Sequence, residues 1–356
     1  MSLPENSQRV LSYVDALRES AELEMSNDEN VFVFGLDVDD HKAIQGSTSG
    51  LVEKFGPERV FTTPLSEDAM TGVAIGAAMA GMRPIHVHIR MDFLMLCMNQ
   101  LINIAAKSSY MYGGSVKVPM VVRSMIGKSW GQGAQHSQAL YSMFMHVPGL
   151  KVIAPSNAYD AKGALAAAIQ DDNPVIFVEH RLLYPTEAYV PEERYTIELG
   201  RARVVRSGAD VTLVGISNMV LECLRAAELL EDAGISAEVI DPITLAPLDT
   251  DTIVQSVQKT KYLLIVDNAW TACGASAEIL SRVVETMGTN AGADMRRMGF
   301  APTSCPTTPA LEDHFYPNPV TISKRIFEML RGTAKHWEPD SKKAELAYQK
   351  QFKGPF

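Results

Sequence analysis

The sequence lacks the features that mark several large classes of protein. Its four cysteines, Cys97, Cys223, Cys273 and Cys305, lie far apart and form no C-x-x-C pair. We therefore expect free, mostly buried thiols and neither a disulfide framework nor a zinc site. No apolar run reaches the roughly 18 residues of a membrane span. The first residues show no charged-then-apolar leader, so a cytoplasmic location is expected.

A basic block and a phosphate-binding loop are also missing. The net charge is −10, which argues against nucleic acid and anionic membrane as partners. No G-x-x-x-x-G-K-[ST] sequence occurs, and the glycines of GVAIGAAMAG (72–81) lack the G-x-G-x-x-G spacing. A stand-alone nicotinamide dehydrogenase is therefore the least favoured enzyme class.

Two runs of alternating strands and helices make up most of the chain. Helices are predicted at 8–29, 70–82, 93–107 and 157–170, and buried strands at 31–35 and 83–89 and in VPMVVRS, LKVIAPS and PVIFVEH. Apolar strands without alternation, separated by helices, predict an α/β fold with a parallel sheet covered on both faces. After the proline-rich stretch 184–195 the pattern restarts, which predicts a second, smaller α/β domain.

Three side chains are candidates for chemistry, and each has a simpler interpretation. Glu67 follows a turn, where an acid in the first turn of a helix with Ser66 or Thr63 as its cap is the default. The functional alternative is a carboxylate at the mouth of an apolar site. Phe93 is a core aromatic by default, whereas His136 in GAQHSQ is a better candidate for proton transfer because glycine and glutamine surround it.

Two further histidines, His86 and His88, alternate on one predicted strand and so share a face. Because no third ligand lies nearby, an ordinary polar face is favoured over a metal site. Ser129 and Ser137 have no hydrolase elbow around them, which gives little support to a serine nucleophile.

These motifs follow one another in an order that resembles a known family. They are TTPLSEDAMTGVAIGAAMAGMRPI, DF…NQLINIAAK, GAQHSQ, PGLKVIAPSNAYDAKGALAAAIQDDNPVIFVEH and EVIDPITLAPLDTDTIVQSVQKT. Together they resemble the beta subunit of thiamine diphosphate-dependent 2-oxoacid dehydrogenase first components, of the pyruvate and branched-chain type. The resemblance implies a transketolase-like pyrimidine-binding domain at 1–190, a transketolase C-terminal-like domain at 196–332 and a charged tail at 333–356.

The resemblance also implies roles for the candidate residues. Glu67 would hydrogen-bond the aminopyrimidine ring of thiamine diphosphate and favour the tautomer that activates the thiazolium carbon. Phe93 would pack on the ring, and Leu65 would line the same slot. His136 would hydrogen-bond the 2-oxoacid and assist transfer of the acyl group to a lipoyl carrier.

One absence decides how such an enzyme is assembled. The family binds Mg²⁺ and diphosphate through a G-D-G motif followed by an asparagine, and this chain has no G-D-G. The resemblance therefore implies an alpha chain that carries the Mg²⁺ site, a second beta chain in a heterotetramer and, as a further partner, a lipoyl-bearing acyltransferase. It also implies a K⁺ site at Met120, Ala168, Asp171 and Asn173, where the simpler interpretation is a strand and a helix end.

Several positions depart from the family pattern. Leu36 stands where the family has an acid, and Arg90 and Lys128 lie close to the expected pocket. Arg90 or Lys128 could bind an extra carboxylate or phosphate of the substrate, and neutral drift is an equal alternative. The departures leave open a split transketolase-like or acyloin-forming carboligase subunit, and, as another class, a regulatory subunit without catalytic activity.

Overall fold

The computed structural model describes residues 9–40, 44–128, 131–288 and 292–347, and the chain forms two compact units. The first unit comprises residues 1–126 and 143–199, and the second comprises residues 127–142 and 200–356. No helix in the described ranges combines the length and apolar character that crossing a membrane requires. Cys97, Cys223 and Cys305 are buried, Cys273 is exposed and all of these thiols are free, as predicted.

The first unit is built on the predicted parallel sheet. Its strands lie in the order β6-β7-β5-β4-β2-β3, and every neighbouring pair is parallel. Their bounds are β2 Val31–Gly35, β3 Val60–Thr62, β4 Arg83–His88, β5 Val121–Ile126, β6 Lys151–Ile153 and β7 Val175–His180. All residues of β2, β5 and β7 are buried, which confirms that helices cover both faces.

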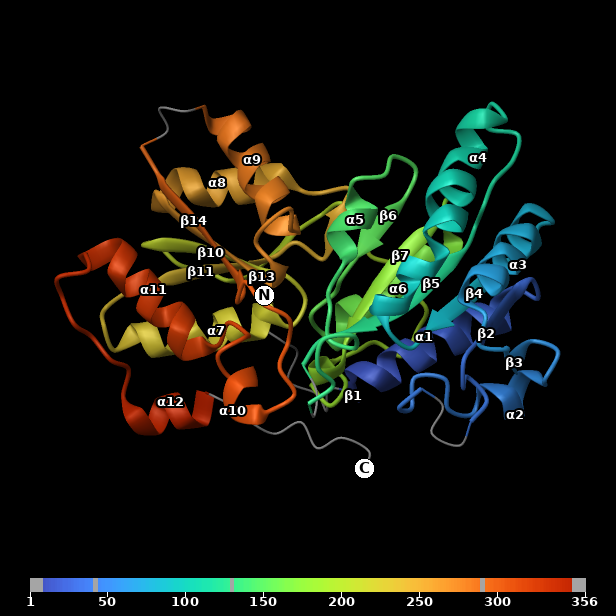
Figure 1. The fold of residues 1–356 in the computed structure, drawn as a ribbon, viewed down its shortest axis with the longest axis horizontal. Helices are drawn as coiled ribbons and strands as arrows, with labels where there is room; N and C mark the ends of the chain where they lie inside the picture. The colour runs from blue at the N-terminus through green and yellow to red at the C-terminus, as the bar shows by residue number, and fades with distance from the viewer. Residues whose placement is uncertain (1–8, 41–43, 129–130, 289–291, 348–356) are drawn as a thin grey trace. The chain divides into compact units, whose positions relative to one another are not determined.

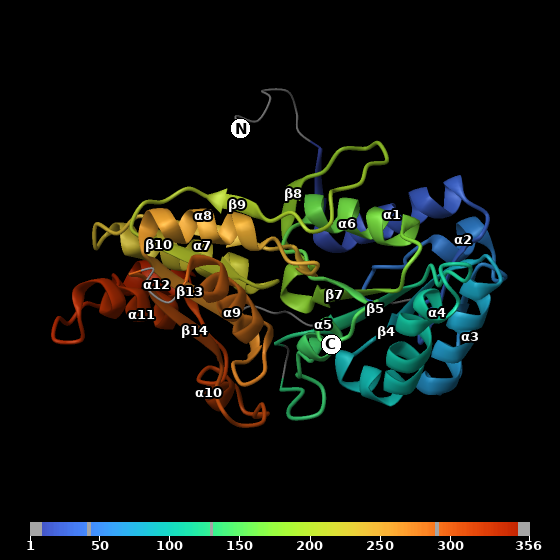
Figure 2. The same ribbon diagram turned by 90° about the horizontal axis from the view of Figure 1, so that it is seen from above.

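Two helical layers cover this sheet (Figure 2). One layer is α1 (Tyr13–Asn27) with α6 (Ala158–Gln170), and the other contains α3 (Glu67–Met79) and α4 (Ala106–Met111). The Asn157 side chain accepts a hydrogen bond from the Asp160 backbone, so the predicted cap of α6 is confirmed. The short helix α2 spans Leu51–Phe55, and the 3₁₀ turn η3 spans Arg181–Leu183.

The helix predicted at 93–107 is wrong in type. The chain forms a 3₁₀ helix, η1 (Met91–Cys97), then a π-helix, η2 (Asn99–Ala105), and only then α4. A 3₁₀ turn overwinds the backbone and a π turn underwinds it. In combination they keep one side of the segment buried from Leu94 through Leu101 to Ala105.

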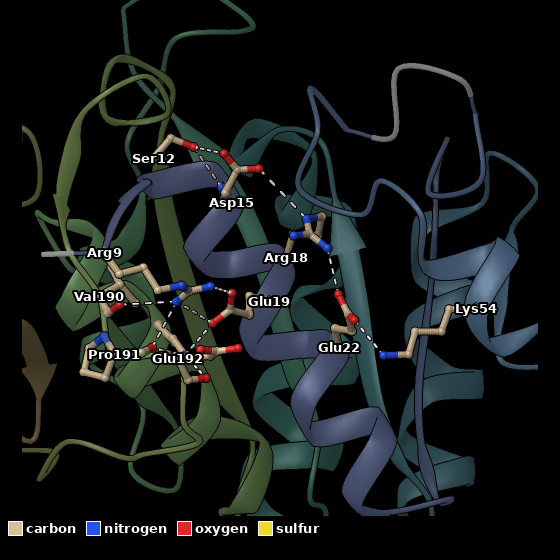
Figure 3. Close-up of polar contacts among 11 residues, drawn as sticks. Arg9, Ser12, Asp15, Arg18, Glu19, Glu22, Lys54, Val190, Pro191 and Glu192 are labelled. Carbon is tan, nitrogen blue, oxygen red and sulfur yellow. Dashed lines mark hydrogen bonds and ion pairs between the residues drawn. The ribbon is translucent and has the colours of Figure 1, made fainter. Parts of the chain in front are cut away.

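The stretch after η3 is tied to the start of the chain. Strand β1 (Val10–Ser12) pairs antiparallel with β8 (Glu187–Tyr189). Arg9 donates to Glu19 of α1 and to the carbonyls of Val190 and Pro191 (Figure 3). The two contacts with carbonyl oxygens are both 3.2 Å long. The segment predicted as a linker is therefore anchored on the first unit.

The second unit is a smaller α/β domain, as predicted. Its strands lie in the order β14-β13-β10-β11-β9, with β9 antiparallel to β11 and the other pairs parallel. Helices α7 and α11 pack together on one face and α8 and α9 on the other (Figure 1). The strands of this sheet are β9 Arg203–Arg206, β10 Val211–Gly215, β11 Ala237–Asp241, β13 Tyr262–Trp270 and β14 Asp294–Phe300, and the short strand β12 (Thr244–Ala246) is not part of it. The helices are α7 Met219–Glu231, α8 Thr250–Thr260, α9 Ala275–Met287, α10 Pro309–Glu312, α11 Pro319–Arg331 and α12 Ser341–Ala347.

Candidate functional site

Glu67 lies at the carboxyl edge of the first unit's sheet. Strand β3 ends at Thr62, and the Thr63 N–H donates to the Gly35 carbonyl at 3.0 Å, which ties the turn to the end of β2. A Cβ atom on Gly35 would lie 2.3 Å from the Val87 carbonyl oxygen, so only glycine fits there. Ser66 is the N-cap of α3, although its side chain makes no capping bond, and Glu67 is the first helical residue. The half-buried carboxylate therefore lies at the positive end of the helix dipole.

Apolar side chains stand exposed on the same part of the unit. Leu65 is 76% exposed in the turn before α3, and Phe93 is 36% exposed on η1. Helices η1 and α3 pack against each other, so the structure brings the elements that carry Leu65, Glu67 and Phe93 together. A carboxylate and exposed apolar side chains on neighbouring elements suit the binding of a flat heterocycle with a ring nitrogen.

The two strand histidines are buried beneath α3, so the predicted polar face is wrong. The His88 ring nitrogen Nε2 lies 3.4 Å from the hydroxyl of Thr71, one turn after Glu67. Burial lowers the pKa of His86 to about 4 and the pKa of His88 well below its usual value. Both imidazoles are therefore neutral packing groups near pH 7. Within the described ranges, no three His, Cys, Asp or Glu side chains are grouped to hold a metal ion.

The loop that carries His136 packs within the second unit. The Lys128 ammonium lies 3.2 Å from the Asp313 carboxylate and 5.6 Å from the centre of the Tyr316 ring. A Cβ atom on Gly131 would lie 2.5 Å from the Thr307 carbonyl oxygen, which shows how closely the loop lies on that segment. His136 is half-buried. Ser129, also considered above, lies outside the described residues.

Arg90, in the first unit, remains a candidate for binding a carboxylate or phosphate of the substrate. It is the N-cap residue of η1, three positions before Phe93, and it is half-buried. Burial lowers the pKa of its guanidinium, which the charge of Asp92 partly offsets. The guanidinium stays protonated near pH 7 because the ordinary pKa of an arginine lies far above neutral pH.

The residues expected to bind K⁺ cluster around the end of α6, but oxygens of Met120, Ala168 and Asp171 already have internal donors. The Met120 carbonyl accepts from Val175 N–H, and the Ala168 carbonyl accepts from Asp171 N–H. Arg83 donates to the Asp171 carbonyl at 3.1 Å, and Lys151 pairs with the Asp171 carboxylate. Each carbonyl oxygen keeps a second lone pair, so the donor set is compatible with a cation without requiring one.

Sequence reasoning did not single out Thr71. The available signal was its spacing from Glu67, because Thr71 lies four residues later and residues four apart on a helix share one face. Burial also raises the pKa of Cys97 to about 11, so that thiol is neutral and serves as packing.

Known proteins match both units. Residues 9–187 match the family model of the transketolase pyrimidine binding domain, and residues 200–322 match that of the transketolase C-terminal domain. Among solved structures, a split-gene transketolase described as an inactive beta4 tetramer aligns with a TM-score of 0.72 at 21% identity, covering 90% of this chain and 98% of that one. This likeness confirms the predicted two-domain transketolase-like fold.

Curated relatives are similar over most of their length. The beta subunit of acetoin:2,6-dichlorophenolindophenol oxidoreductase from Bacillus subtilis is 42% identical over 334 residues, covering 90% of this chain and 98% of that protein. The pyruvate dehydrogenase E1 beta subunit of Rickettsia felis is 45% identical over 271 residues, covering 76% of this chain and 83% of that protein. The mitochondrial pyruvate dehydrogenase E1 beta subunit of Pisum sativum is 41% identical over 311 residues, covering 86% and 87%. The chain therefore belongs to the family of transketolase-like beta subunits that includes these pyruvate dehydrogenase E1 and acetoin oxidoreductase chains.

Proposed function

We propose that this chain is the beta subunit of a two-chain thiamine diphosphate enzyme and that it holds the aminopyrimidine half of the cofactor. The single observation that carries this is the position of Glu67. Glu67 is the first residue of α3, at the carboxyl edge of the sheet in the part of the chain that matches the pyrimidine-binding domain. Helix α3 packs against η1, which carries Phe93. The exposed Leu65 and Phe93 side chains supply the apolar surface that a ring needs.

Each residue has a distinct role in this proposal. Thiamine diphosphate, when bound, supplies the electron sink for breaking a bond next to a carbonyl group. Glu67 shares a proton with a ring nitrogen, and Phe93 packs on the face of the ring. His136 hydrogen-bonds the substrate oxygen and moves a proton there, because an imidazole ring carries nitrogens that can donate and accept a proton.

The partner chains follow from the surface and from the missing diphosphate motif. An alpha chain would supply Mg²⁺ and the G-D-G sequence that this chain lacks. Exposed apolar side chains gather on the layer of α3, η1, η2 and α4, at Val73, Met79, Leu96, Tyr110 and Met111. Such a surface is typical of subunit contacts, so we assign it to the alpha chain and a second beta chain in a heterotetramer.

The favoured substrate is a 2-oxoacid that is decarboxylated, with the acyl group passed to a lipoyl carrier on an acyltransferase. Relatives named for pyruvate dehydrogenase support this substrate class. Relatives named for acetoin oxidoreductase favour a second candidate, an acyloin that is cleaved or formed at the same site. Acyl-lipoyl formation from 2-oxoacids, compared with acetoin consumption and carboligation, distinguishes the two.

Lys128 and Arg90 are the proposed selectors of an acidic substrate. Lys128 would have to exchange its Asp313 partner for a substrate carboxylate. Arg90 would bind such a carboxylate with its guanidinium at the start of η1. A screen of acidic and neutral 2-oxoacids with Lys128→Ala and Arg90→Ala tests this role. An unchanged substrate preference in both variants would rule it out.

The decisive experiment is Glu67→Gln in the complete two-chain assembly. We expect turnover to fall by about 10² to 10⁴, because a proton-transferring group is lost while shape and assembly are kept. Asp68→Asn, at the exposed neighbouring position of the same helical turn, is the matched control and should keep turnover. Full activity of Glu67→Gln would refute the proposal and favour a regulatory subunit.

The K⁺ site and the cytoplasmic location stay proposals. Replacing K⁺ by Na⁺ should lower the melting temperature if the carbonyls around Asp171 bind the ion. The name of the pea relative places that protein in mitochondria.

A further inference from the structure

The loop that carries His136 ends at an edge of the second unit's sheet where α/β domains commonly bind ligands. In this sheet β10 lies between β11 and β13, and the chain leaves β10 through α7 towards β11. Strands β10 and β13 are parallel, with Gly215 opposite Val266, so their carboxyl ends meet at one edge. The crevice beyond the carboxyl ends of such strands is the usual ligand site of doubly wound sheets.

Here a side chain of the protein itself binds at that edge. Tyr141 is fully buried, and its hydroxyl donates to Asp267 Oδ1 at 2.5 Å. Asp267 directly follows Val266 on β13, and its other oxygen accepts from Ser276 N–H, in the first turn of α9, at 2.8 Å. A Cβ atom on Gly274 would lie 3.0 Å from the same Asp267 oxygen, so the carboxylate is held tightly at the start of the helix.

The chemistry of this contact favours a fixed anchor. Burial and the neighbouring carboxylate raise the pKa of Tyr141 well above its usual value, so the hydroxyl keeps its proton and donates. Burial also raises the pKa of Asp267, while the hydrogen bonds from Tyr141 and from Ser276 lower it, so these donors favour the ionised carboxylate that accepts from them. His136 lies five residues before Tyr141, and Lys128 holds the other end of the loop on Asp313.

We propose that Tyr141 and Asp267 are positioning residues for His136: the buried hydroxyl-to-carboxylate hydrogen bond anchors the 131–141 segment on the second unit and so fixes where the imidazole stands. This inference rests on the proposed function, in which His136 contacts the substrate. A tyrosine at this position thereby couples the packing of the second unit to catalysis.

The test is a double-mutant cycle in the complete two-chain assembly. Tyr141→Phe keeps the ring and removes the hydroxyl, and we expect kcat to fall about tenfold with the apparent affinity for thiamine diphosphate unchanged. In the His136→Gln background the same substitution should change kcat by about twofold or less, because its effect passes through the imidazole.

Tyr184→Phe is the matched control. The Tyr184 hydroxyl donates to the buried Glu179 carboxylate at 2.7 Å in the first unit, so its removal breaks the same type of bond far from this loop in the chain. Its effect on kcat, whatever its size, should be the same factor with and without His136. Equal factors for Tyr141→Phe in the two backgrounds would overturn the proposal.

Hydrogen–deuterium exchange of the full chain gives a readout that does not depend on activity. Amides of residues 133–140 should exchange faster in Tyr141→Phe, and Asp267→Asn, which keeps an acceptor for the hydroxyl, should show a smaller change in the same direction. Unchanged exchange in both variants would refute the anchor. If His136→Gln leaves turnover intact, the proposed role of His136 fails, while the exchange data still decide whether Tyr141 holds the segment.

Discussion

The helical layers on the two faces of the first unit's sheet differ in the side chains that they leave exposed. On the α1 and α6 face, the buried Lys162 ammonium donates to Glu19 at 2.6 Å and to the carbonyls of Pro191 and Glu192, and Glu24 pairs with Arg194. On the other face, Leu96 is 58% exposed and Tyr110 is 90% exposed. The first face satisfies its polar groups within the chain, whereas the second leaves apolar area that another chain can cover.

The largest effect is expected from a charge on the exposed apolar face. Leu96→Asp should abolish assembly with the alpha chain, and with it all turnover, because a buried unpaired carboxylate in an interface costs several kcal/mol. Analytical ultracentrifugation of the mixed chains measures this.

A control variant places the same charge on the α1 and α6 face, where the polar groups are satisfied within the chain. Ser26→Asp, at an exposed position of α1, should leave assembly intact. If Leu96→Asp assembles normally and turns over substrate, the apolar face is not the subunit contact.

The next effect concerns stability. Lys162→Met removes a cation that is 1% exposed and leaves the Glu19 carboxylate with one fewer donor. We expect the free energy of unfolding to fall by about 3 kcal/mol, as for other broken buried ion pairs. Urea denaturation measures this loss. A loss no larger than that of the surface variant Arg18→Ala would contradict the view that the α1 and α6 face depends on its buried ion pairs.

The same network predicts a dependence of stability on pH. Burial alone would raise the pKa of Glu19, but hydrogen bonds from Arg9 and Lys162 outweigh burial and lower it below 4.5. A carboxyl whose folded pKa is lowered stabilises the fold above its unfolded pKa and loses that contribution as the pH falls through the folded pKa. Between about pH 5 and pH 3, wild type should therefore lose more stability than Lys162→Met, as acid titration at fixed urea would show.

The smallest effect is expected at the rim of α1. Arg18 pairs with Glu22 four residues on, and both side chains are partly exposed (Figure 3). Arg18→Ala should change the free energy of unfolding by about 0.5 kcal/mol or less, because such pairs are screened by solvent. A loss near that of Lys162→Met would mean that exposure does not separate the two contacts.

Local patterns predicted much of the fold. Strand β2 was expected at 31–35 and is found there, and Asn157 caps α6, because apolar runs and capping side chains act over a few residues. The run at 93–107 is apolar on most sides, so its periodicity could not reveal a 3₁₀ and a π segment. Strand β14 lies at a sheet edge with half-buried residues, and such a strand leaves no continuous apolar signal.

The candidate site was predictable only in part. The resemblance proposed Glu67, Phe93 and His136 from their motifs, but contacts between distant parts of the chain were not visible. Asp313 follows Lys128 by 185 residues, and Asp267 follows Tyr141 by 126 residues. Burial of His86 and His88 was missed because alternation on a strand does not say which face is covered.

The most direct test is calorimetry of thiamine diphosphate with Mg²⁺ added to this chain alone, to the alpha chain alone and to their mixture. The half-site proposal predicts tight binding only by the mixture, and weaker binding when the mixture contains Glu67→Gln. Tight binding and turnover by this chain alone would contradict it.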